Sequence, residues 1–377
     1  MSRPAGAASD PASHPALCVL GLMSGTSMDG IDAAFLTTDG TALLGRGESR
    51  FVPFSNELRA QIEAAVKASI AWNGNGECPQ AVREAERAFT LATASAVKAL
   101  IAEANRAPDL IGFHGQTVLH RPDAGLTVQI GDGALLAQLT DCPVVNEFRV
   151  ADMAAGGQGA PFAPAYHAAA LAQSGIAPPA AVLNLGGVAN ITYWDGEQLL
   201  AFDTGPANGP LDQWIEAGTG APMDKGGSIS AAGQVHSNVI ASLLDHPYFD
   251  LAPPKSLDRF DFDAQGVRGL SLEDGAATLV AFSAQSLALA FRHLPRLPKR
   301  AIACGGGRHN PALMAALREA LPCPVVTAES QGWRGDFIEA EAFAFLAARS
   351  RAGLPLSFPG TTGVPAPQTG GVFHEPG

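Results

Sequence analysis

The residue best placed to act as a base is Asp203, which ends an apolar run. It lies in LLAFDTGPANG (199–209), between the apolar residues LLAF and a Gly–Pro turn. A carboxylate that follows a buried strand reaches a cleft more readily than a core, and there it can accept a proton. The same aspartate can also form a turn with its own backbone, and the local pattern leaves both interpretations open. Aspartic proteases share the Asp–Thr–Gly triplet, but a fused two-domain protease needs two triplets and this chain has one.

Three glycine-rich turns are candidates for binding an anion. They lie in GLMSGTSMDGID (21–32), NLGGVAN (184–190) and CGGGRHN (304–310). Glycine lets backbone N–H groups approach a phosphate closely, and Ser and Thr hydroxyls add further donors. The lysine of a GxxxxGK[ST] loop does not follow the first turn, so a P-loop fold is not expected. Each turn could equally be an ordinary connection between two elements, because short glycine motifs are weak evidence.

Several polar side chains interrupt apolar or glycine-rich segments and are candidates for ligand contacts. They are His114 and Gln116 in FHGQT, and Arg149 and Asp152 in FRVAD. A guanidinium can bind a carboxylate through two parallel hydrogen bonds, which suits Arg149 to an acidic ligand. Arg149 could instead pair with Asp152 in a structural role, and His114 could be a buried structural histidine. Glu339 opens the last helix, where a carboxylate could support a metal or a nucleotide but is also favoured by the helix dipole.

The elements that must position these residues alternate between strands and helices. Apolar runs at 16–22 and 31–38 flank the first glycine turn and predict a two-stranded hairpin. Apolar residues at helical spacing predict helices over 56–70, 80–104, 207–217, 229–244, 275–294 and 336–353. Strands are expected in 109–115, 127–148, 199–209 and 300–321, the second and last of which also hold a helix. The opening pattern recurs over 181–195, so the two halves predict a duplicated α/β architecture.

The predicted domain boundaries follow from this order. A chain of 377 residues with 47% hydrophobic content can bury a large core and favours two domains. A polar tail over 1–15 is expected to be disordered, and 16–150 forms a first α/β domain with the first glycine turn. Residues 151–335 form a second α/β domain with the other two turns and Asp203, after a Gly/Pro-rich crossover. Residues 336–377 form a C-terminal helix that packs back at the domain interface, followed by a tail.

Composition limits the classes of function. The net charge is −12 and Lys and Arg form no block, so a nucleic acid is not an expected partner. The cysteines are scattered without a CxxC pair, which predicts neither a disulfide framework nor a zinc site and favours a reducing compartment. The N-terminal segment lacks the apolar core of a secretory signal, and no uninterrupted run of about 18 apolar residues occurs. A cytoplasmic protein without a membrane partner is therefore expected.

Beyond these features, the motifs are similar to those of the anhydro-N-acetylmuramic acid kinase family. The string GLMSGTSMDGID matches the hallmark of that family nearly letter for letter. Further motifs follow in the family's order: FHGQTVLHRP (113–122), QIGDGALLA (129–137), FRVADMAAGGQGAPFAP (148–164), NLGGVANIT (184–192), FDTGPANGPLDQW (202–214), PPKS (253–256), CGGGRHNPALM (304–314) and EAEAFAFLA (339–347). The resemblance covers roughly residues 17–364. Departures are modest: Glu147 stands where Asp is expected, Ala207 replaces Gly, and LDRF (257–260) replaces a Thr/Gly-containing segment, which leaves the role of Lys255 open.

The resemblance implies the two-domain actin-like ATPase fold of actin, hsp70 and sugar kinases, with ATP in a cleft between duplicated α/β domains. The residues that it implies for ATP lie in the three glycine turns: Gly25, Thr26, Ser27, Met28, Asp29, Gly30, Ile31, Asp32, Gly186, Gly187, Asn190, Gly305, Gly306 and Gly307. It implies Asp203 as the catalytic base and His114, Gln116, Arg149 and Asp152 as sugar contacts. ATP and Mg are the implied cofactors. Glu339 or Asp29 could support the metal, and a site made of protein ligands alone is not expected.

The reaction that the resemblance implies combines hydrolysis with phosphorylation. Asp203 would deprotonate a water that attacks the anomeric carbon of 1,6-anhydro-N-acetylmuramic acid, and the freed O6 would take the γ-phosphoryl group of ATP. The product would be N-acetylmuramic acid 6-phosphate, as in peptidoglycan recycling. Two alternatives stay open: an ordinary kinase of the same fold acting on another amino sugar, and a non-catalytic sugar-sensing protein. The expected partners are a small sugar and ATP, with a homodimer as an option.

Overall fold

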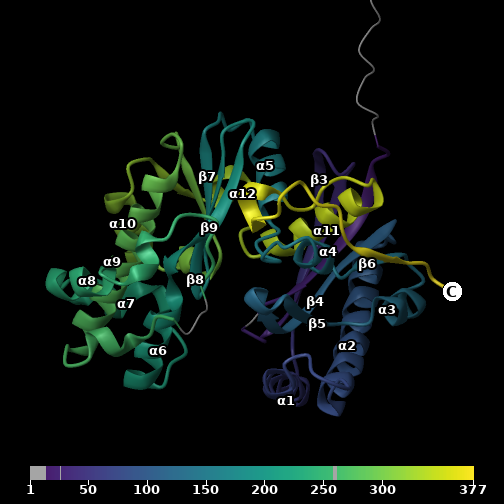
Figure 1. Ribbon diagram of the computed structural model, residues 1–377, viewed down its shortest axis with the longest axis horizontal. Coiled ribbons are helices and arrows are strands. Elements are labelled where there is room, and N and C mark those ends of the chain that lie inside the picture. Colours follow the sequence, from purple (N-terminus) through teal and green to yellow (C-terminus); the bar gives the residue numbers. More distant parts are fainter. Residues whose placement is uncertain (1–13, 26, 258–260) are drawn as a thin grey trace, which may run out of the picture. The chain divides into compact units, whose positions relative to one another are not determined.

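The computed structural model describes residues 14–25, 27–257 and 261–377, which form two compact units (Figure 1). The first unit ends at Ala154 and also includes Ala340–Leu356 and Gln368–Gly377. The second unit comprises Ala155–Glu339 and Ser357–Pro367.

These units divide the chain differently from the boundaries expected from sequence. The expected boundary at residue 150 lies at the start of α4 (Val150–Ala154), whereas the units separate at the end of that helix. The expected C-terminal region, 336–377, is divided between the two units. Most of the expected tail, 1–15, lies outside the described residues, as does Thr26.

The first unit is built around a mixed sheet, which has seven strands in the described part of the chain. These strands are β1 (Leu17–Ser24), β2 (Gly30–Thr38), β3 (Leu43–Pro53), β4 (Leu110–Arg121), β5 (Leu126–Ile130), β6 (Val144–Asn146) and β12 (Val372–His374). They lie in the order β12-β6-β4-β1-β2-β3, and β5 pairs with β4. The strands β1, β2 and β3 are antiparallel, whereas β4 runs parallel to β1 and β6 runs parallel to β4. The accompanying helices are α1 (Asn56–Trp72), α2 (Gln80–Ala104), α3 (Gly133–Thr140), α4 and most of α11 (Ile338–Arg351).

The local sequence explains where α1 begins and which side it buries. The Ser55 hydroxyl accepts the Leu58 N–H at 3.2 Å and so satisfies a donor that the first helical turn leaves open. The buried residues Leu58, Ile62, Ala65 and Ser69 recur at spacings of three or four and form one stripe along the helix. The helix predicted over 56–70 is therefore confirmed.

Two glycines let α11 lie directly on the first sheet. Gly21 of β1 and Gly112 of β4 are paired across the two parallel strands. A Cβ atom at Gly21 would lie 1.8 Å from the Ala340 carbonyl oxygen, and one at Gly112 would lie 2.2 Å from that of Phe343. These neighbours are helix backbone, which cannot turn aside as a long side chain can, so both positions require glycine. The pair therefore seats α11 on the strand that leads into the first glycine turn.

The second unit is built around a five-stranded mixed sheet of described residues. Its strands are β7 (Ala180–Leu185), β8 (Val188–Trp194), β9 (Leu199–Pro206), β10 (Ala301–Cys304) and β11 (Val325–Thr327). The strands β7, β8 and β9 are antiparallel, whereas β10 runs parallel to β7 and β11 runs parallel to β10. The accompanying helices are α5 (Pro164–Gln173), α6 (Asn208–Thr219), α7 (Ser228–Ala232), α8 (Ser237–Leu244), α9 (Leu272–Ala290), α10 (Pro311–Ala320) and α12 (Pro359–Thr362).

The helix α9 lies in the core of the second unit. The Ser271 hydroxyl accepts the Asp274 N–H at 3.1 Å and caps its first turn. The stretch Leu272–His293 is long and apolar enough to cross a membrane. An 18-residue window of it has a mean hydropathy of 1.2, and 72% of that window is buried inside the structure. Its apolar side chains pack with those of the sheet and of neighbouring helices, as in a core helix of this composition.

Both sheets have the same strand order. The first reads β3-β2-β1-β4-β6 and the second reads β9-β8-β7-β10-β11, with three antiparallel strands followed by two parallel ones in each. The predicted duplicated α/β architecture is confirmed. The strands β3, β11 and β12 lie outside the sequence-based expectations, because β3 exposes many polar side chains and the other two have three residues each.

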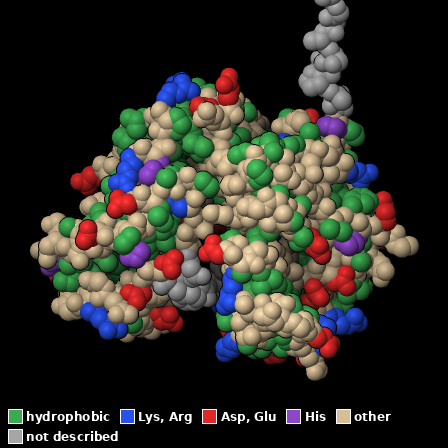
Figure 2. Space-filling model, viewed as in Figure 1, with side chains coloured by type: hydrophobic (Ala, Val, Ile, Leu, Met, Phe, Trp, Pro, Cys, Tyr) green, Lys and Arg blue, Asp and Glu red, His purple; other side chains and the backbone are tan. Residues whose placement is uncertain are grey.

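Charged side chains are mixed on the surface. On the face shown in Figure 2, the acidic and basic side chains of the described residues are interspersed over both units. Because acidic residues outnumber basic ones, 36 to 24, any approaching polyanion meets negative charge beside positive charge. Recognition of a small anion would therefore depend on backbone N–H groups or on individual arginines.

Candidate active site

The first glycine turn joins β1 to β2 and is held by side chains from two other elements. The buried Gln116 of β4 donates to the Gly25 carbonyl oxygen at 3.1 Å, and its amide oxygen accepts the Ser24 hydroxyl at 2.6 Å. Arg59 of α1 donates to the Ser27 carbonyl oxygen at 3.1 Å. Sequence analysis assigned Gln116 to the sugar, whereas in the structure both ends of its amide hold the turn.

The residues of this turn differ in how much room they leave for a ligand. Among the described residues, a Cβ atom at Gly25 would meet nothing nearer than the Ser27 hydroxyl at 3.6 Å, so these residues leave the space over Gly25 open. A Cβ atom at Gly30 would lie 2.5 Å from the Val52 carbonyl oxygen, so packing against β3 requires that glycine. Ile31 is 2% exposed and belongs to the core, so only its backbone could meet a nucleotide.

The tip of the turn presents oxygen atoms to solvent. Ser27 and Asp29 are exposed, and the Ser27 hydroxyl donates to the Asp29 carboxylate at 2.8 Å. Met28 has a φ of 52°, and its N–H donates to the Gly25 carbonyl oxygen at 3.2 Å. Asp32 is partly exposed on β2. Because a carboxylate repels a phosphate directly, Asp29 suits a metal bound to phosphates better than the phosphates themselves.

Replacing Gly25 by Val is expected to raise the Kd for ATP at least about tenfold and to leave the Kd for the sugar within a few-fold. The open space over Gly25 accommodates a side chain in the folded protein, and that side chain would keep a phosphate away from the backbone. Calorimetric titration with each ligand measures the effect. Gly45→Val in β3 is the matched control, since a Cβ atom there lies 3.9 Å from Thr37. An equal rise of both Kd values in a folded variant would contradict the assignment.

His114 orients Arg149 in the first unit. The Nδ1 atom of His114 lies 2.8 Å from the Gly115 carbonyl oxygen and donates to it, which leaves Nε2 as an acceptor. Arg149 donates to that nitrogen from Nε at 3.1 Å and from Nη2 at 2.9 Å. Burial and the guanidinium hold the pKa of His114 well below its usual value, so the ring is neutral. It therefore orients the guanidinium without neutralising its charge, while Asp152 is buried on α4.

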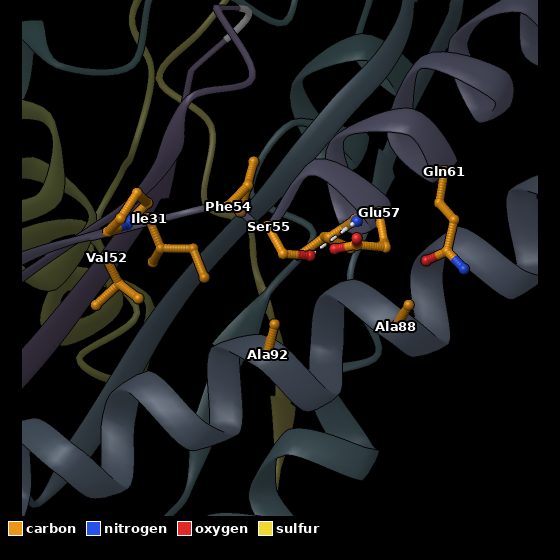
Figure 3. A pocket seen from close by; sticks show the side chains of 10 residues that line it. Ile31, Val52, Phe54, Ser55, Glu57, Gln61, Ala88 and Ala92 are labelled. Atoms are coloured by element: carbon orange, nitrogen blue, oxygen red, sulfur yellow. Dashed lines mark hydrogen bonds between the residues drawn. The ribbon is translucent and has the colours of Figure 1, made fainter.

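The first unit also contains a small pocket between the end of β3 and the helices α1 and α2 (Figure 3). Its volume is about 300 Å³, and it is lined by Ile31, Val52, Pro53, Phe54, Ser55, Glu57, Leu58, Gln61, Ala88 and Ala92. The charged group among these residues is the carboxylate of Glu57, which disfavours a phosphate. Of the residues expected to bind ligands, only Ile31 belongs to the lining.

In the second unit, polar residues form a row across four strands. Asp203 of β9 is paired with Asn190 of β8, Asn190 with Asn184 of β7, and Asn184 with Cys304 of β10. Side chains of directly paired residues project from the same face of a sheet. The row therefore places Asp203 and Asn190, both expected at the site, beside Asn184, which sequence analysis did not identify.

The Asp203 carboxylate is held by a distant loop rather than by its own turn. The Leu257 N–H donates to Oδ2 of Asp203 at 2.8 Å. The Asp203 N–H donates to the Lys255 carbonyl oxygen at 3.0 Å, and the Tyr248 hydroxyl donates to the Asp203 carbonyl oxygen at 2.7 Å. Burial raises the pKa of Asp203 to about 7, although the Leu257 N–H acts in the opposite direction. A carboxylate with this pKa can take up a proton in a neutral solution, as a general base must.

The second glycine turn caps α6. The carbonyl oxygens of Gly186 and Gly187 accept the first N–H groups of that helix, from Ala207 (3.0 Å), Asn208 (2.9 Å) and Gly209 (3.1 Å). Gly209 must be glycine, since a Cβ atom there would lie 2.9 Å from the Gly187 carbonyl oxygen. Gly187 is exposed, and a Cβ atom on it would meet nothing nearer than 4.0 Å. The open side of the turn is therefore at Gly187.

The triple glycine follows β10 and contains one open position. Gly305 has a φ of 74°, and a Cβ atom there would lie 2.5 Å from Oδ1 of Asn184. A Cβ atom at Gly307 would lie 2.7 Å from the side chain of Leu185. At Gly306 the nearest such atom is 3.8 Å away. Backbone conformation and packing thus account for the outer two glycines, and the surface available to a ligand is at Gly306.

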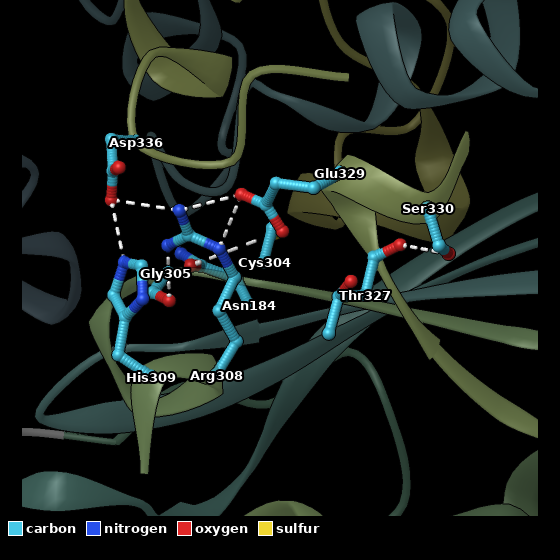
Figure 4. A network of polar contacts seen from close by, with 9 residues as sticks. All are labelled: Asn184, Cys304, Gly305, Arg308, His309, Thr327, Glu329, Ser330 and Asp336. Carbon is cyan, nitrogen blue, oxygen red and sulfur yellow. Dashed lines mark hydrogen bonds and ion pairs between the residues drawn. The ribbon is translucent and has the colours of Figure 1, made fainter. Parts of the chain in front are cut away.

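A buried arginine fixes this turn (Figure 4). The Arg308 side chain is 2% exposed and forms ion pairs with Glu329 at 2.7 Å and Asp336 at 2.9 Å. Its Nη1 donates to the Gly305 carbonyl oxygen at 2.8 Å. His309 adds a contact to Asp336 at 3.2 Å. The guanidinium therefore ties the start of the triple glycine to a loop 20 to 30 residues farther along the chain.

Arg308→Lys is expected to raise the KM for ATP about tenfold while kcat stays within about twofold. An ammonium keeps the charge beside the two carboxylates, but it cannot also donate to the Gly305 carbonyl oxygen as a guanidinium does. ATP saturation curves at saturating sugar measure both constants. Arg318→Lys on α10 is the control, and a loss of kcat at unchanged KM would contradict this positioning of the turn.

Some residues around the site carried little signal in the sequence. Asn184 begins the second glycine motif, and the interrupted apolar run there could have identified it. Tyr248 meets Asp203 across 45 residues, and local patterns could not identify it. Glu339 is exposed, and its charge contributes to the raised pKa of Cys304, which places it near the end of β10.

Two sheets of identical strand order, each with a glycine turn between its first two strands, are the topology of the actin-like ATPase fold. They place the protein in the class of actin-like ATPases, which includes sugar kinases. The chain belongs to the anhydro-N-acetylmuramic acid kinase family, whose model matches residues 17–375.

Curated relatives match over nearly their whole length. The anhydro-N-acetylmuramic acid kinase of Rhizorhabdus wittichii is 50% identical over 365 residues, which cover 96% of this chain and 99% of the relative. That of Phenylobacterium zucineum is 47% identical, covering 95% and 99%. A solved ROK family glucokinase from Streptomyces griseus, in complex with glucose and AMPPNP, covers 88% of this chain and 99% of its own at 14% identity and a TM-score of 0.40. This likeness is too distant to decide the fold, which the strand order establishes.

Proposed function

We propose that this chain converts 1,6-anhydro-N-acetylmuramic acid, water and ATP into N-acetylmuramic acid 6-phosphate and ADP. The observation that carries the proposal is the Asp203 carboxylate, whose pKa is about 7 and whose orientation is set by the Leu257 N–H. The reaction needs a base for water, whereas phosphoryl transfer needs mainly positioning and charge neutralisation. The family relationship supports this substrate.

In the proposed mechanism, Asp203 accepts a proton from a water molecule as the oxygen of that water attacks the anomeric carbon. The bond between this carbon and O6 breaks, which opens the anhydro ring. The freed O6 then attacks the γ-phosphorus of ATP, and ADP leaves. The proton taken by Asp203 returns to solvent after the product has formed.

We assign ATP binding to backbone and side-chain groups of the three glycine turns. The open positions Gly25, Gly187 and Gly306 would allow close approach, while Gly30, Gly305 and Gly307 preserve the shape of their turns. The other assigned residues are Thr26, Ser27, Met28, Asp29, Ile31, Asp32, Gly186 and Asn190. Backbone N–H groups near these glycines would bind phosphate oxygens directly.

Magnesium fits the oxygen donors of this site. Among the described residues, no group of three or more His, Cys, Asp or Glu side chains could hold a metal ion alone. Either the exposed Asp29 carboxylate or Glu339 would supply an oxygen to an ion held mainly by ATP phosphates. Bound there, Mg²⁺ would neutralise charge on the transferred phosphoryl group.

Sugar recognition is assigned to the first unit's polar cluster. Arg149 would bind the lactyl carboxylate of the muramic acid, with its guanidinium oriented by the neutral His114. Asp152 would accept hydrogen bonds from sugar hydroxyls or the acetamido N–H, and Gln116 would act through the first glycine turn. We place this reaction in the cytoplasm, where ATP is available.

Turnover in ¹⁸O-labelled water tests the proposed function. The purified protein would be incubated with ATP, Mg²⁺ and the anhydro sugar, and the product would be analysed by mass spectrometry. One labelled oxygen at the anomeric carbon is expected. An ordinary kinase would phosphorylate a reducing amino sugar without incorporating the label, and a sugar-sensing protein would bind sugar without consuming ATP.

A further inference from the structure

Lys255 is a buried lysine that the proposed reaction does not use. It is 7% exposed and lies on the loop between Asp250 and the loop's described end at Leu257. Its ammonium donates to the Tyr248 carbonyl oxygen at 3.1 Å and lies 4.4 Å from the centre of the Tyr248 ring. Burying an ammonium is costly unless its contacts compensate, so this placement needs an explanation.

The contacts of Lys255 lead to both ends of the catalytic aspartate. The Lys255 carbonyl oxygen accepts the Asp203 N–H at 3.0 Å, and the Tyr248 hydroxyl donates to the Asp203 carbonyl oxygen at 2.7 Å. Two residues beyond Lys255, the Leu257 N–H donates to the Asp203 carboxylate at 2.8 Å. The side chain of Lys255 thus closes a ring of hydrogen bonds through Tyr248, Asp203 and the loop.

The charged groups near this ring come from several elements. Burial, followed by the charges of Asp203 and Asp261, raises the pKa of the Tyr248 hydroxyl. Besides burial, the charge of Arg292 lowers the pKa of Lys255 and that of Asp250 raises it. Burial, followed by the charges of Lys255 and Arg292, lowers the pKa of His293. Burial and the charge of Arg292 disfavour the charged form of Lys255, and its contacts with the Tyr248 carbonyl oxygen and ring stabilise that form.

Lys255 is linked to Asp203 through the loop. Burial raises the pKa of Asp203, and the Leu257 N–H lowers it. The Leu257 N–H faces the carboxylate only while the loop keeps its position. The hydrogen bond and ring contact of Lys255 with Tyr248 fasten that loop two residues away.

We infer that Lys255 is a positioning residue for the base: by fastening the loop to Tyr248, it keeps the Leu257 N–H on the Asp203 carboxylate. This inference rests on the proposed role of Asp203 as the base. The sequence left the role of Lys255 in the PPKS motif (253–256) open, and this inference assigns it one. The ammonium itself touches neither the water nor the sugar.

Lys255→Met tests the inference, because methionine retains an apolar stem over the Tyr248 ring but cannot donate a hydrogen bond. Loss of the Leu257 N–H contact would raise the pKa of Asp203 by about one, since a hydrogen bond to the charged form favours ionisation. The acidic limb of the kcat/KM profile should move to higher pH by the same amount. At pH 6 the variant would be about tenfold slower than wild type, and near pH 9.5 the two rates would converge.

Two further variants complete the experiment. Lys255→Gln removes the ammonium from the face of the Tyr248 ring but can still donate a hydrogen bond, so it should shift the limb in the same direction by a smaller amount. Lys299→Met removes an exposed lysine of the same unit and should leave the limb in place. Titration of ¹³C-labelled aspartate carboxyls by NMR reads the pKa of Asp203 directly, without turnover.

The outcomes separate this inference from the proposed function. If Lys255→Met lowers kcat/KM equally at every pH and the Asp203 titration is unchanged, Lys255 is merely structural and the inference fails. If Asp203→Asn retains wild-type activity, the assignment of the base fails, and the role of Lys255 fails with it. If Lys255→Met does not fold, Lys255→Gln decides, and an unshifted limb in that variant overturns the inference.

Discussion

Asp203→Asn is expected to lower kcat at least about 100-fold, while the Kd values for ATP and the sugar change by only a few-fold. Asparagine has nearly the same shape and retains an oxygen that can accept the Leu257 N–H, so the loop should keep its position. It cannot accept the proton of the attacking water. General-base catalysis contributes on the order of 10²- to 10⁴-fold, which sets the size of the loss.

Steady-state kinetics and calorimetric titration of the purified variant measure the two effects separately. Asp195→Asn is the matched control, because Asp195 lies in the turn between β8 and β9, where its carboxylate binds the N–H groups of Glu197 and Gln198. That variant should retain wild-type kcat. If folded Asp203→Asn kept more than about a tenth of wild-type kcat, the loss would fall below the range for a general base. The base would then have to be sought among other carboxylates, beginning with Glu339 and Asp152.

Asp203→Asn is also expected to be more stable than wild type at pH 8, by up to about 4 kcal/mol, and equally stable near pH 4. Burial raises the pKa of Asp203 to about 7 in the folded state, whereas an unfolded aspartate titrates near about 3.9. Between these values the folded state binds more protons than the unfolded state, so wild-type stability falls as the pH rises. The figure is an upper value because the side chain is partly exposed.

Urea unfolding of both proteins at pH 4, 6 and 8 measures this difference through the transition midpoints. Asp195→Asn should behave oppositely, because the N–H groups of Gln198 and Glu197 lower the pKa of that carboxyl despite its partial burial. Its loss of stability should be present at pH 8 and should shrink as the pH falls through the lowered pKa. A wild type that is as stable as Asp203→Asn at pH 8 would show that Asp203 is readily ionised when folded. At pH values where Asp203 is ionised, the buried carboxylate lowers the stability of the folded state. Such a loss of stability is expected when a residue is placed for catalysis and not for stability.

The sequence by itself determined the elements around the turns and the family. Apolar runs on both sides of the glycine turns predict the pairs β1–β2 and β7–β8, because side-chain alternation and glycine conformation are properties of neighbouring residues. The repetition of that pattern predicts the duplicated architecture that the two strand orders confirm. Several motifs in one order were enough to indicate the family. The same motifs predicted that Asp203 ends its strand, whereas β9 continues from Asp203 to Pro206.

Only the tertiary structure decided which residues meet. The register of β7, β8 and β9 brings Asn184, Asn190 and Asp203 into one row, and no local pattern specifies a register between strands. The loop contact from Leu257 to Asp203 spans 54 residues and sets the orientation of the carboxylate. Chain folding also separates glycines that look alike in sequence. A Cβ atom at Gly306 would have room, whereas one at Gly305 would clash with Asn184. The space around each position is set by residues that are distant in the chain.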